Sequence, residues 1–174
     1  MPIMTTRDLE NMQIDVIERP QVRAAALRHV GPYPQIGPVF DKLCGIAVVS
    51  GWLSLPEACT LMVTYDCPDT VPATELRSDA AVVVGPDSVL PVDVDELIIP
   101  AGRYVRGVYI GPYSGLADAW KAFGENVRSA GYPVQGSTAM EVYVSDPRTC
   151  PVDELRTDLL IPLTAELRVD GTQR

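Results

Sequence analysis

Gly111-Pro112-Tyr113 is the stretch that decides the fold, because the same three residues stand 80 positions earlier as Gly31-Pro32-Tyr33. Two further motifs return in the same order: Gly51-Trp52 as Gly131-Tyr132, and Glu75-Leu76-Arg77-Ser78-Asp79 as Glu154-Leu155-Arg156-Thr157-Asp158, the last at a shift of 79. A single one-residue deletion explains the two shifts. Because motifs that recur in order and at fixed spacing indicate duplication, we interpret residues 13–85 and 93–164 as two repeats.

The 174 residues fit one compact domain, residues 1–174, with the two repeats sharing one sheet. Residues 1–12 and 165–174 are polar, and we expect them to be flexible ends. A seam between duplicated halves is a place where ligand clefts form.

Each repeat is expected to contain two strands, a helix and two further strands. The first two strands of each repeat should form hairpins turned by proline, Ile14–Glu18 with Val22–Val30 and Glu96–Ile99 with Arg103–Ile110. The later strands are expected at Thr60–Tyr65, Ala80–Val84, Thr138–Ser145 and Asp158–Leu163. An apolar stripe at helical spacing occurs in both repeats, at Ile36, Phe40, Leu43 and Ala47 and at Leu116, Trp120, Phe123 and Val127.

This order of elements predicts an α+β fold, in which a mainly antiparallel eight-stranded sheet carries two main helices on one face. The tandem repeat makes the fold pseudo-symmetric, with a central ligand cleft. The repeated Glu-Leu-Arg tripeptides precede a strand in both halves, and we interpret them as loop anchors rather than catalytic groups.

Composition excludes several classes of function. With 14 basic and 23 acidic side chains the net charge is −9, which repels phosphate backbones, so no direct nucleic-acid binding is expected; the charge favours cationic partners or serves solubility. Cys44, Cys59, Cys67 and Cys150 form no C-x-x-C pair, and His29 is the single histidine, which argues against a metal site. No signal run, membrane-length apolar stretch or cofactor fingerprint occurs, so we expect a cytoplasmic protein with reduced thiols and no cofactor.

Glu141 is the most informative candidate site residue. Strand alternation places it on one face with Ala139, Tyr143 and Ser145, opposite Met140, Val142 and Val144. A carboxylate among apolar and aromatic neighbours loses hydration, which raises its pKa unless a cation or hydrogen-bond donor satisfies it. The alternatives are a solvent-facing strand residue or a carboxylate paired with Arg103 or Arg106. The first repeat offers Leu61 or Met62 at the aligned position, so only one half supplies the charge.

Rings from both repeats are candidate walls of the cleft: Tyr33, Phe40, Trp52, Tyr109, Tyr113, Trp120, Tyr132 and Tyr143. Phe40 and Trp120 also lie on the helical stripes, where packing against the sheet is the competing explanation. His29 aligns with Tyr109, and each is a candidate hydrogen-bond donor to a ligand or a structural residue.

Taken together, these motifs resemble the GyrI-like domain, which also serves as the effector-binding domain of AraC-type and multidrug-sensing MerR-type regulators. The resembling stretches are His29–Tyr33, Glu75–Asp79, Ile99–Tyr104, Gly111–Gly115 with Trp120, and Met140–Tyr143 leading into Asp146-Pro147. The resemblance implies a pseudo-symmetric fold whose central groove binds lipophilic, often cationic small molecules, with Glu141 as the buried counter-ion. The family's regulators carry a DNA-binding domain ahead of this one, and here about a dozen residues precede the first strand, which favours a stand-alone binder.

Three functions follow as hypotheses. The first is polyspecific, multidrug-type binding of lipophilic cations, for sequestration or sensing. The second is hydrolysis of cyclopropanoid toxins, as in some stand-alone relatives, with Glu141 as general base. The third is inhibition of DNA gyrase or binding of another protein partner through the acidic surface, which rests on the family name. Whether the chain is an enzyme stays open, with binding favoured.

Overall fold

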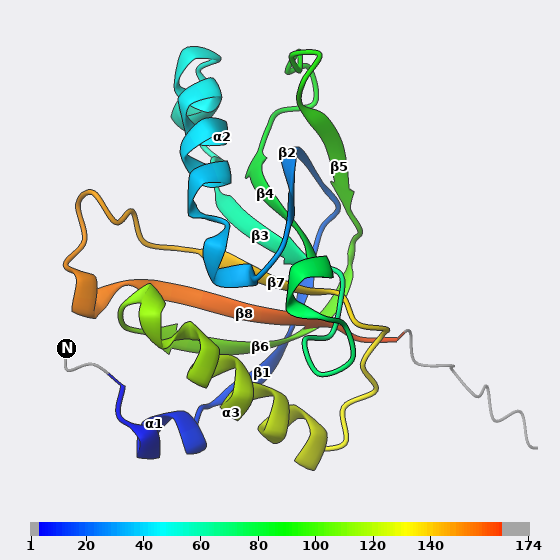
Figure 1. Cartoon of the computed structure of the whole chain (residues 1–174), viewed down its shortest axis with the longest axis vertical. Coiled ribbons are helices and arrows are strands. Elements are labelled where there is room, and N and C mark those ends of the chain that lie inside the picture. Colours follow the sequence, from blue (N-terminus) through cyan, green and yellow to red (C-terminus); the bar gives the residue numbers. More distant parts are fainter. Residues whose placement is uncertain (1–3, 165–174) are drawn as a thin grey trace, which may run out of the picture.

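The computed structural model describes residues 4–164 and arranges them as one sheet with helices packed against it (Figure 1). The α-helices are α1 (Thr6–Glu10), α2 (Gly37–Val49) and α3 (Leu116–Ser129). The strands are β1 (Ile14–Arg19), β2 (Val22–Val30), β3 (Thr60–Thr64), β4 (Arg77–Val83), β5 (Asp95–Ile99), β6 (Gly102–Ile110), β7 (Ala139–Tyr143) and β8 (Arg156–Pro162). The predicted α+β fold, with an eight-stranded antiparallel sheet and two main helices, is confirmed.

The two main helices form where the sequence stripes predict them. Phe123 and Val127 of α3 and Leu43 and Ala47 of α2 are buried against the sheet. Gly51 and Gly131 follow the two helices with φ of 72° and 71°. Glycine adopts this left-handed conformation without steric cost, and it therefore ends each helix at the equivalent place.

The strand order β1-β6-β8-β7-β3-β4-β2-β5 places the seam between the repeats at the β3–β7 pair. The predicted hairpins are wrong: β1 pairs with β6 of the second repeat, and β5 pairs with β2 of the first. The first strand of each repeat therefore pairs with a strand of the other repeat. Prolines 20 and 100 do turn the chain, but the turns connect strands that lie in different parts of the sheet.

This exchange explains why the sheet curls. β1 stands at one end of the strand order and β2 near the other, yet only two residues, Pro20 and Gln21, join them. The turn from β5 to β6 through Pro100 and Ala101 makes the reciprocal connection. Two such short connections draw the ends of the sheet together, and twisted antiparallel strands accommodate this curvature.

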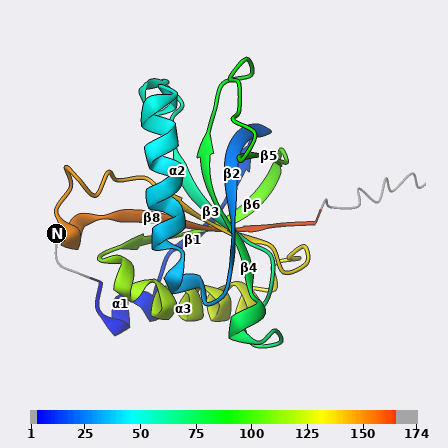
Figure 2. The same cartoon turned by 45° about the horizontal axis from the view of Figure 1, so that its top comes forward.

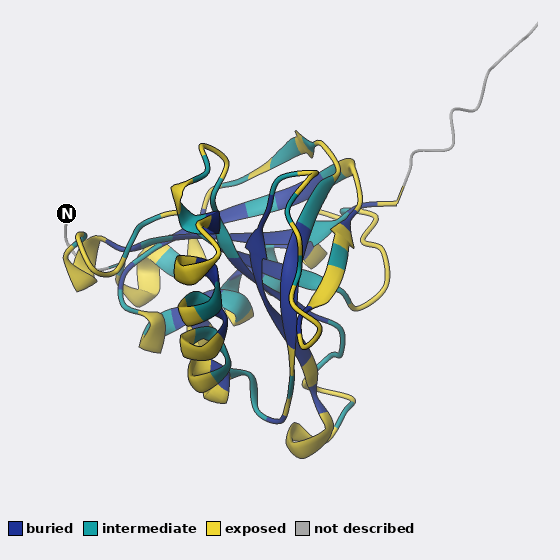
Figure 3. Ribbon diagram, turned by 90° about the horizontal axis from the view of Figure 1, so that it is seen from above, coloured by how far each residue is buried: buried dark blue, intermediate teal, exposed yellow. Residues whose placement is uncertain are grey.

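Both main helices cover the same face of the curled sheet (Figures 1 and 2). Under α2 lie Ala25, Met62, Ala80 and Val82, and under α3 lie Val105, Tyr109 and Leu159. The opposite face carries a third apolar cluster, with Leu61, Val63, Ala81, Met140, Val142 and Leu160. Buried residues consequently concentrate in the strands, while the outer sides of the helices are exposed (Figure 3).

The N-terminal segment, which we expected to be flexible, contains α1 packed beside α3. Thr5 and Asp8 form a capping box, in which the Thr5 side chain accepts from the Asp8 amide and the Asp8 carboxylate accepts from the Thr5 amide. Met12 is buried beneath α3. Residues 1–3 and 165–174 lie outside the described part of the chain. Among the residues described, no helix is long and apolar enough to cross a membrane.

Candidate functional site

Glu141 lies at the centre of the sheet, on the helix-covered face of β7. Its cross-strand partners are Met62 on β3 and Leu159 on β8, so it stands beside the seam between the two repeats. The residue is only 6 % exposed. The predicted strand alternation is therefore confirmed, since Met140 and Val142 belong to the cluster on the opposite face, and the solvent-facing alternative is wrong.

Two neutral hydrogen-bond donors hold the Glu141 carboxylate. Trp120 Nε1–H donates to Oε1 at 2.6 Å, and the Tyr143 hydroxyl donates to Oε2 at 2.6 Å. Burial raises the pKa of Glu141 above its ordinary value, and the bonds from Tyr143 and Trp120 offset part of this rise. Arg106, one of the two arginine partners considered above, instead binds Asp15 with two hydrogen bonds. The described hydrogen bonds of this carboxylate thus come from two neutral donors.

Aromatic rings close the space over this carboxylate. The ring of Tyr143 meets Phe40 of α2 edge-on, with centroids 5.5 Å apart, and Tyr113 at 5.3 Å. We call Phe40, Tyr113 and Tyr143 the aromatic cap. Tyr113 is 40 % exposed and forms its outer edge. Trp120 completes the surroundings from α3 and packs on Phe123. Rings from both repeats therefore meet at Glu141.

The repeat relates the residues around the carboxylate in pairs. Strands β3 and β7 correspond at a shift of 79, which makes Met62 the counterpart of Glu141 and removes Leu61 as the alternative. Phe40 and Trp120 are counterparts on the two helices. The Tyr143 hydroxyl lies 2.6 Å from Glu141 Oε2 and 4.0 Å from the Met62 sulfur. The two helices thus place a ring at equivalent positions beside the seam, whereas only the second repeat places a carboxylate there.

The five other candidate residues have local structural contacts. The side chains of His29 and Tyr109 lie 3.1 and 2.9 Å from the carbonyl oxygens of Pro32 and Pro112, respectively, so each steadies its own Gly-Pro-Tyr turn. The Tyr33 hydroxyl donates to the Asp66 carbonyl at 2.6 Å. Trp52 and Tyr132 pack within the apolar clusters under α2 and α3.

The Glu-Leu-Arg motifs behave as the predicted loop anchors. Arg77 donates to the Asp66 carboxylate from its backbone amide and from its guanidinium. The Arg156 amide donates to the Ser145 hydroxyl, and its guanidinium binds Asp158. Both arginines thereby join a strand start to the loop before it.

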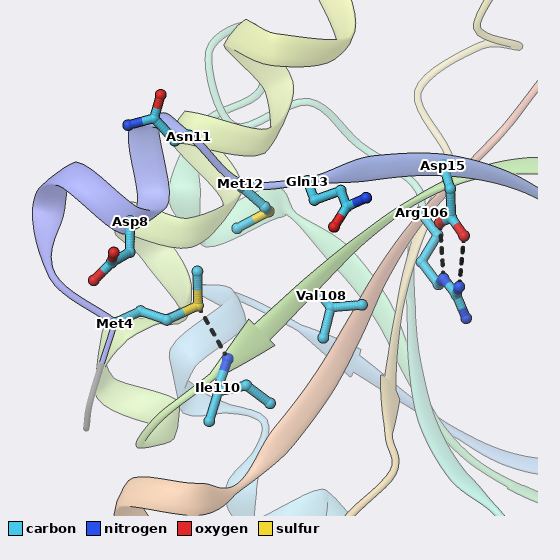
Figure 4. Close-up of a pocket in the computed structure, with 9 residues that line it drawn as sticks. All are labelled: Met4, Asp8, Asn11, Met12, Gln13, Asp15, Arg106, Val108 and Ile110. Atoms are coloured by element: carbon cyan, nitrogen blue, oxygen red, sulfur yellow. Dashed lines mark hydrogen bonds and ion pairs between the residues drawn. The ribbon is translucent and has the colours of Figure 1, made fainter. Parts of the chain in front are cut away.

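Two hollows lie away from Glu141. One of about 560 Å³ lies between α1 and β6, where Met4 contacts Ile110 and Arg106 pairs with Asp15 (Figure 4). The other, about 370 Å³, lies on the opposite face of the sheet beside the β5–β6 turn. Neither hollow is lined by Glu141. Where the sequence predicts a central cleft, the rings of Tyr113 and Phe40 contact Tyr143.

Comparison with known proteins agrees with this architecture. The model of the GyrI-like small molecule binding domain matches residues 12–164. A DNA gyrase inhibitor from Yersinia enterocolitica is 31 % identical over 145 residues, covering 79 % of this chain and 89 % of that protein.

Solved structures share the fold at low sequence identity. The C-terminal domain of EcmrR superposes with a TM-score of 0.70 at 18 % identity, over 88 % of this chain and 98 % of that one. SAV2435, solved with bound tetraphenylphosphonium, gives 0.65 at 12 % identity, over 88 % and 95 %. A hydrolase from Listeria innocua gives 0.59 at 13 % identity, over 94 % of both chains.

Proposed function

The chain belongs to the GyrI-like family of small-molecule-binding domains, and from this premise we propose that it binds lipophilic organic cations against Glu141, for sequestration or sensing. The observation that carries the proposal is a carboxylate, 6 % exposed, whose hydrogen bonds come from Trp120 and Tyr143. A delocalised cation would supply the missing charge. The tetraphenylphosphonium bound by SAV2435 is a cation of this class.

The aromatic cap accounts for breadth of ligand choice. Rings of Phe40, Tyr113 and Trp120 offer π faces and edges from both helices' sides of the site, and cation–π contacts contribute roughly 0.5–2 kcal/mol each. Apolar surfaces and one charge impose few directional demands, so several ligands of different shape fit the same walls. Entry requires the cap to open, because Tyr143 and Tyr113 cover the carboxylate.

Calorimetric titration with tetraphenylphosphonium tests this function. We expect binding by the wild type and at least about tenfold weaker binding by Glu141→Gln, which preserves shape and hydrogen bonds while removing the charge. Asp87→Asn is the matched control, because that carboxylate is exposed in the loop between β4 and β5 and its loss should leave the affinity unchanged. Equal affinity of wild type and Glu141→Gln would remove the carboxylate from the site.

Hydrolysis is the second candidate, and it is favoured by the raised pKa of Glu141, which suits a general base. The similarity in fold to a hydrolase from Listeria innocua points the same way. Incubation with a cyclopropane-bearing substrate, followed by mass spectrometry, separates the two functions. A hydrated product that forms with wild type and not with Glu141→Gln supports catalysis; an unchanged substrate supports binding alone.

Inhibition of DNA gyrase is a third candidate function, because the relative from Yersinia enterocolitica is named a DNA gyrase inhibitor. A supercoiling assay with purified gyrase checks it. Inhibition that persists in Glu141→Gln would assign the effect to the acidic outer surface, and no inhibition at micromolar protein would remove this candidate.

A further inference from the structure

At equivalent positions of β3 and β7, the Glu141 site has an apolar thioether, Met62, and a carboxylate, Glu141. Met62 and Glu141 face each other directly across the β3–β7 pair, and both are buried, at 3 % and 6 % exposure. The Tyr143 hydroxyl contacts both side chains, at 4.0 Å from the sulfur and 2.6 Å from the carboxylate. A cationic group that displaces this hydroxyl from Glu141 therefore meets the thioether at the same time.

Further negative charge is held on the other face of the sheet. The buried carboxylates among residues 4–164 are Asp79, Glu141 and Asp158. Asp79 accepts from Arg28 and Tyr65, and Asp158 accepts from Arg156. Strand alternation turns both away from Ala80 and Leu159, which pack beneath the helices. Glu141 is therefore the single buried carboxylate on the helix-covered side of the described chain.

We propose that Met62 makes the site selective for lipophilic cations of one charge. The inference rests on the proposed function and extends it to the class of ligand. A second positive charge on the first-repeat side of the seam would lie against Met62, Ala80 and Leu27, a cluster that contains no carboxylate. Asp146, which lies near Tyr113, is already paired with Arg148. An unbalanced charge in an apolar environment is strongly unfavourable, whereas aryl groups pack well against a thioether.

The first test compares two ligands on the wild-type protein. Benzyl viologen carries two fixed charges on a rigid aromatic core, and N-benzyl-4-(4-benzylphenyl)pyridinium has a closely similar shape with one. We expect calorimetry to show the singly charged ligand binding at least about tenfold more tightly. Equal or tighter binding of benzyl viologen would overturn the inference without touching the proposed function, provided that Glu141→Gln still weakens the singly charged ligand. Binding of neither ligand would contradict the proposed function itself.

The second test adds a charge at the symmetric position. Met62→Glu should improve binding of benzyl viologen relative to its analogue by at least about tenfold, whereas Met62→Gln, equal in shape and neutral, should leave the ratio near the wild-type value. An unchanged ratio in Met62→Glu would contradict the inference.

Two buried carboxylates side by side will destabilise the folded protein. A third variant therefore has one carboxylate at the seam, as in the wild type. Met62→Glu combined with Glu141→Gln moves the charge across the seam. Because the Tyr143 hydroxyl lies near both positions, this swap should recover part of the binding of the singly charged ligand that Glu141→Gln alone loses. A folded swap variant that binds no better than Glu141→Gln would show that Met62 does not face the ligand.

Discussion

The buried Glu141 carboxylate lowers the free energy of unfolding of the free protein, and in our proposal it supplies the charge that binds a cation. Its pKa in the folded protein is raised above the ordinary value of 4.5 because the side chain is buried. Below this ordinary value the carboxyl is protonated in folded and unfolded chains alike. As the pH rises, the unfolded chain ionises first, so stability falls until the folded pKa is passed. A bound cation offsets this loss of stability, because it favours the charged form of Glu141.

At the scale of this residue we predict that Glu141→Gln stabilises the free protein near pH 7, because the amide carries no charge to be desolvated. The amide retains the hydrogen bond from Trp120 and needs no counter-ion. Urea unfolding at several pH values measures the difference between variant and wild type, in which the other carboxylates cancel. The difference should vanish near pH 4 and grow as the pH rises; a constant difference would indicate that Glu141 titrates normally.

The site could be predicted only in part from the sequence. Alternation in β7 placed Glu141 and Tyr143 on one face of the strand, and the helical stripes made Phe40 and Trp120 candidate walls. Closure by Tyr113 could not be predicted, because its counterpart Tyr33 is tied to the Asp66 carbonyl whereas Tyr113 leans on Tyr143. Identical tripeptides thus adopt different side-chain contacts, which depend on tertiary neighbours.

At the scale of elements, the packing of α3 on the sheet depends on the absence of a side chain at Gly107. A Cβ there would lie 2.7 Å from the Met12 sulfur and 2.7 Å from a ring carbon of Phe123. The glycine therefore lets both the N-terminal segment and α3 approach β6 closely.

We predict that Gly107→Ala destabilises the protein by about 1–3 kcal/mol, because Met12 and Phe123 must move apart. Gly124→Ala in α3 is the control, since a Cβ there meets no atom within 4 Å; it should stabilise the helix by up to about 1 kcal/mol. Thermal unfolding of the two variants gives the answer. Similar melting temperatures for both would mean that Met12 and Phe123 are not wedged at Gly107.

Local sequence signals predicted most elements and mispaired two strands. The stripes through Leu43 and Phe123 fixed both main helices, and the repeat placed the strands within a few residues. The turns at Pro20 and Pro100 favoured hairpins because nearby segments usually pair. Partner choice for β1 and β5 depends instead on how the whole sheet closes, which no local pattern encodes.

At the scale of the whole molecule, strand exchange makes each repeat incomplete. β1 finds its partner in β6, and β5 finds its partner in β2. We predict that residues 1–88 and 89–174, produced separately, lack cooperative unfolding, and that mixing restores a folded heterodimer. Circular dichroism and size-exclusion chromatography follow the recovery. A first fragment that unfolds cooperatively on its own would contradict the exchanged pairing.

The most direct test of the account is a crystal structure of the protein with tetraphenylphosphonium. We predict that the cation lies between α2 and α3 against the Glu141 carboxylate, with the Tyr143 hydroxyl displaced from its 2.6 Å hydrogen bond and Tyr113 swung outward. A complex in which the cation occupies the hollow beside α1 (Figure 4), with the Glu141–Tyr143 bond intact, would contradict it.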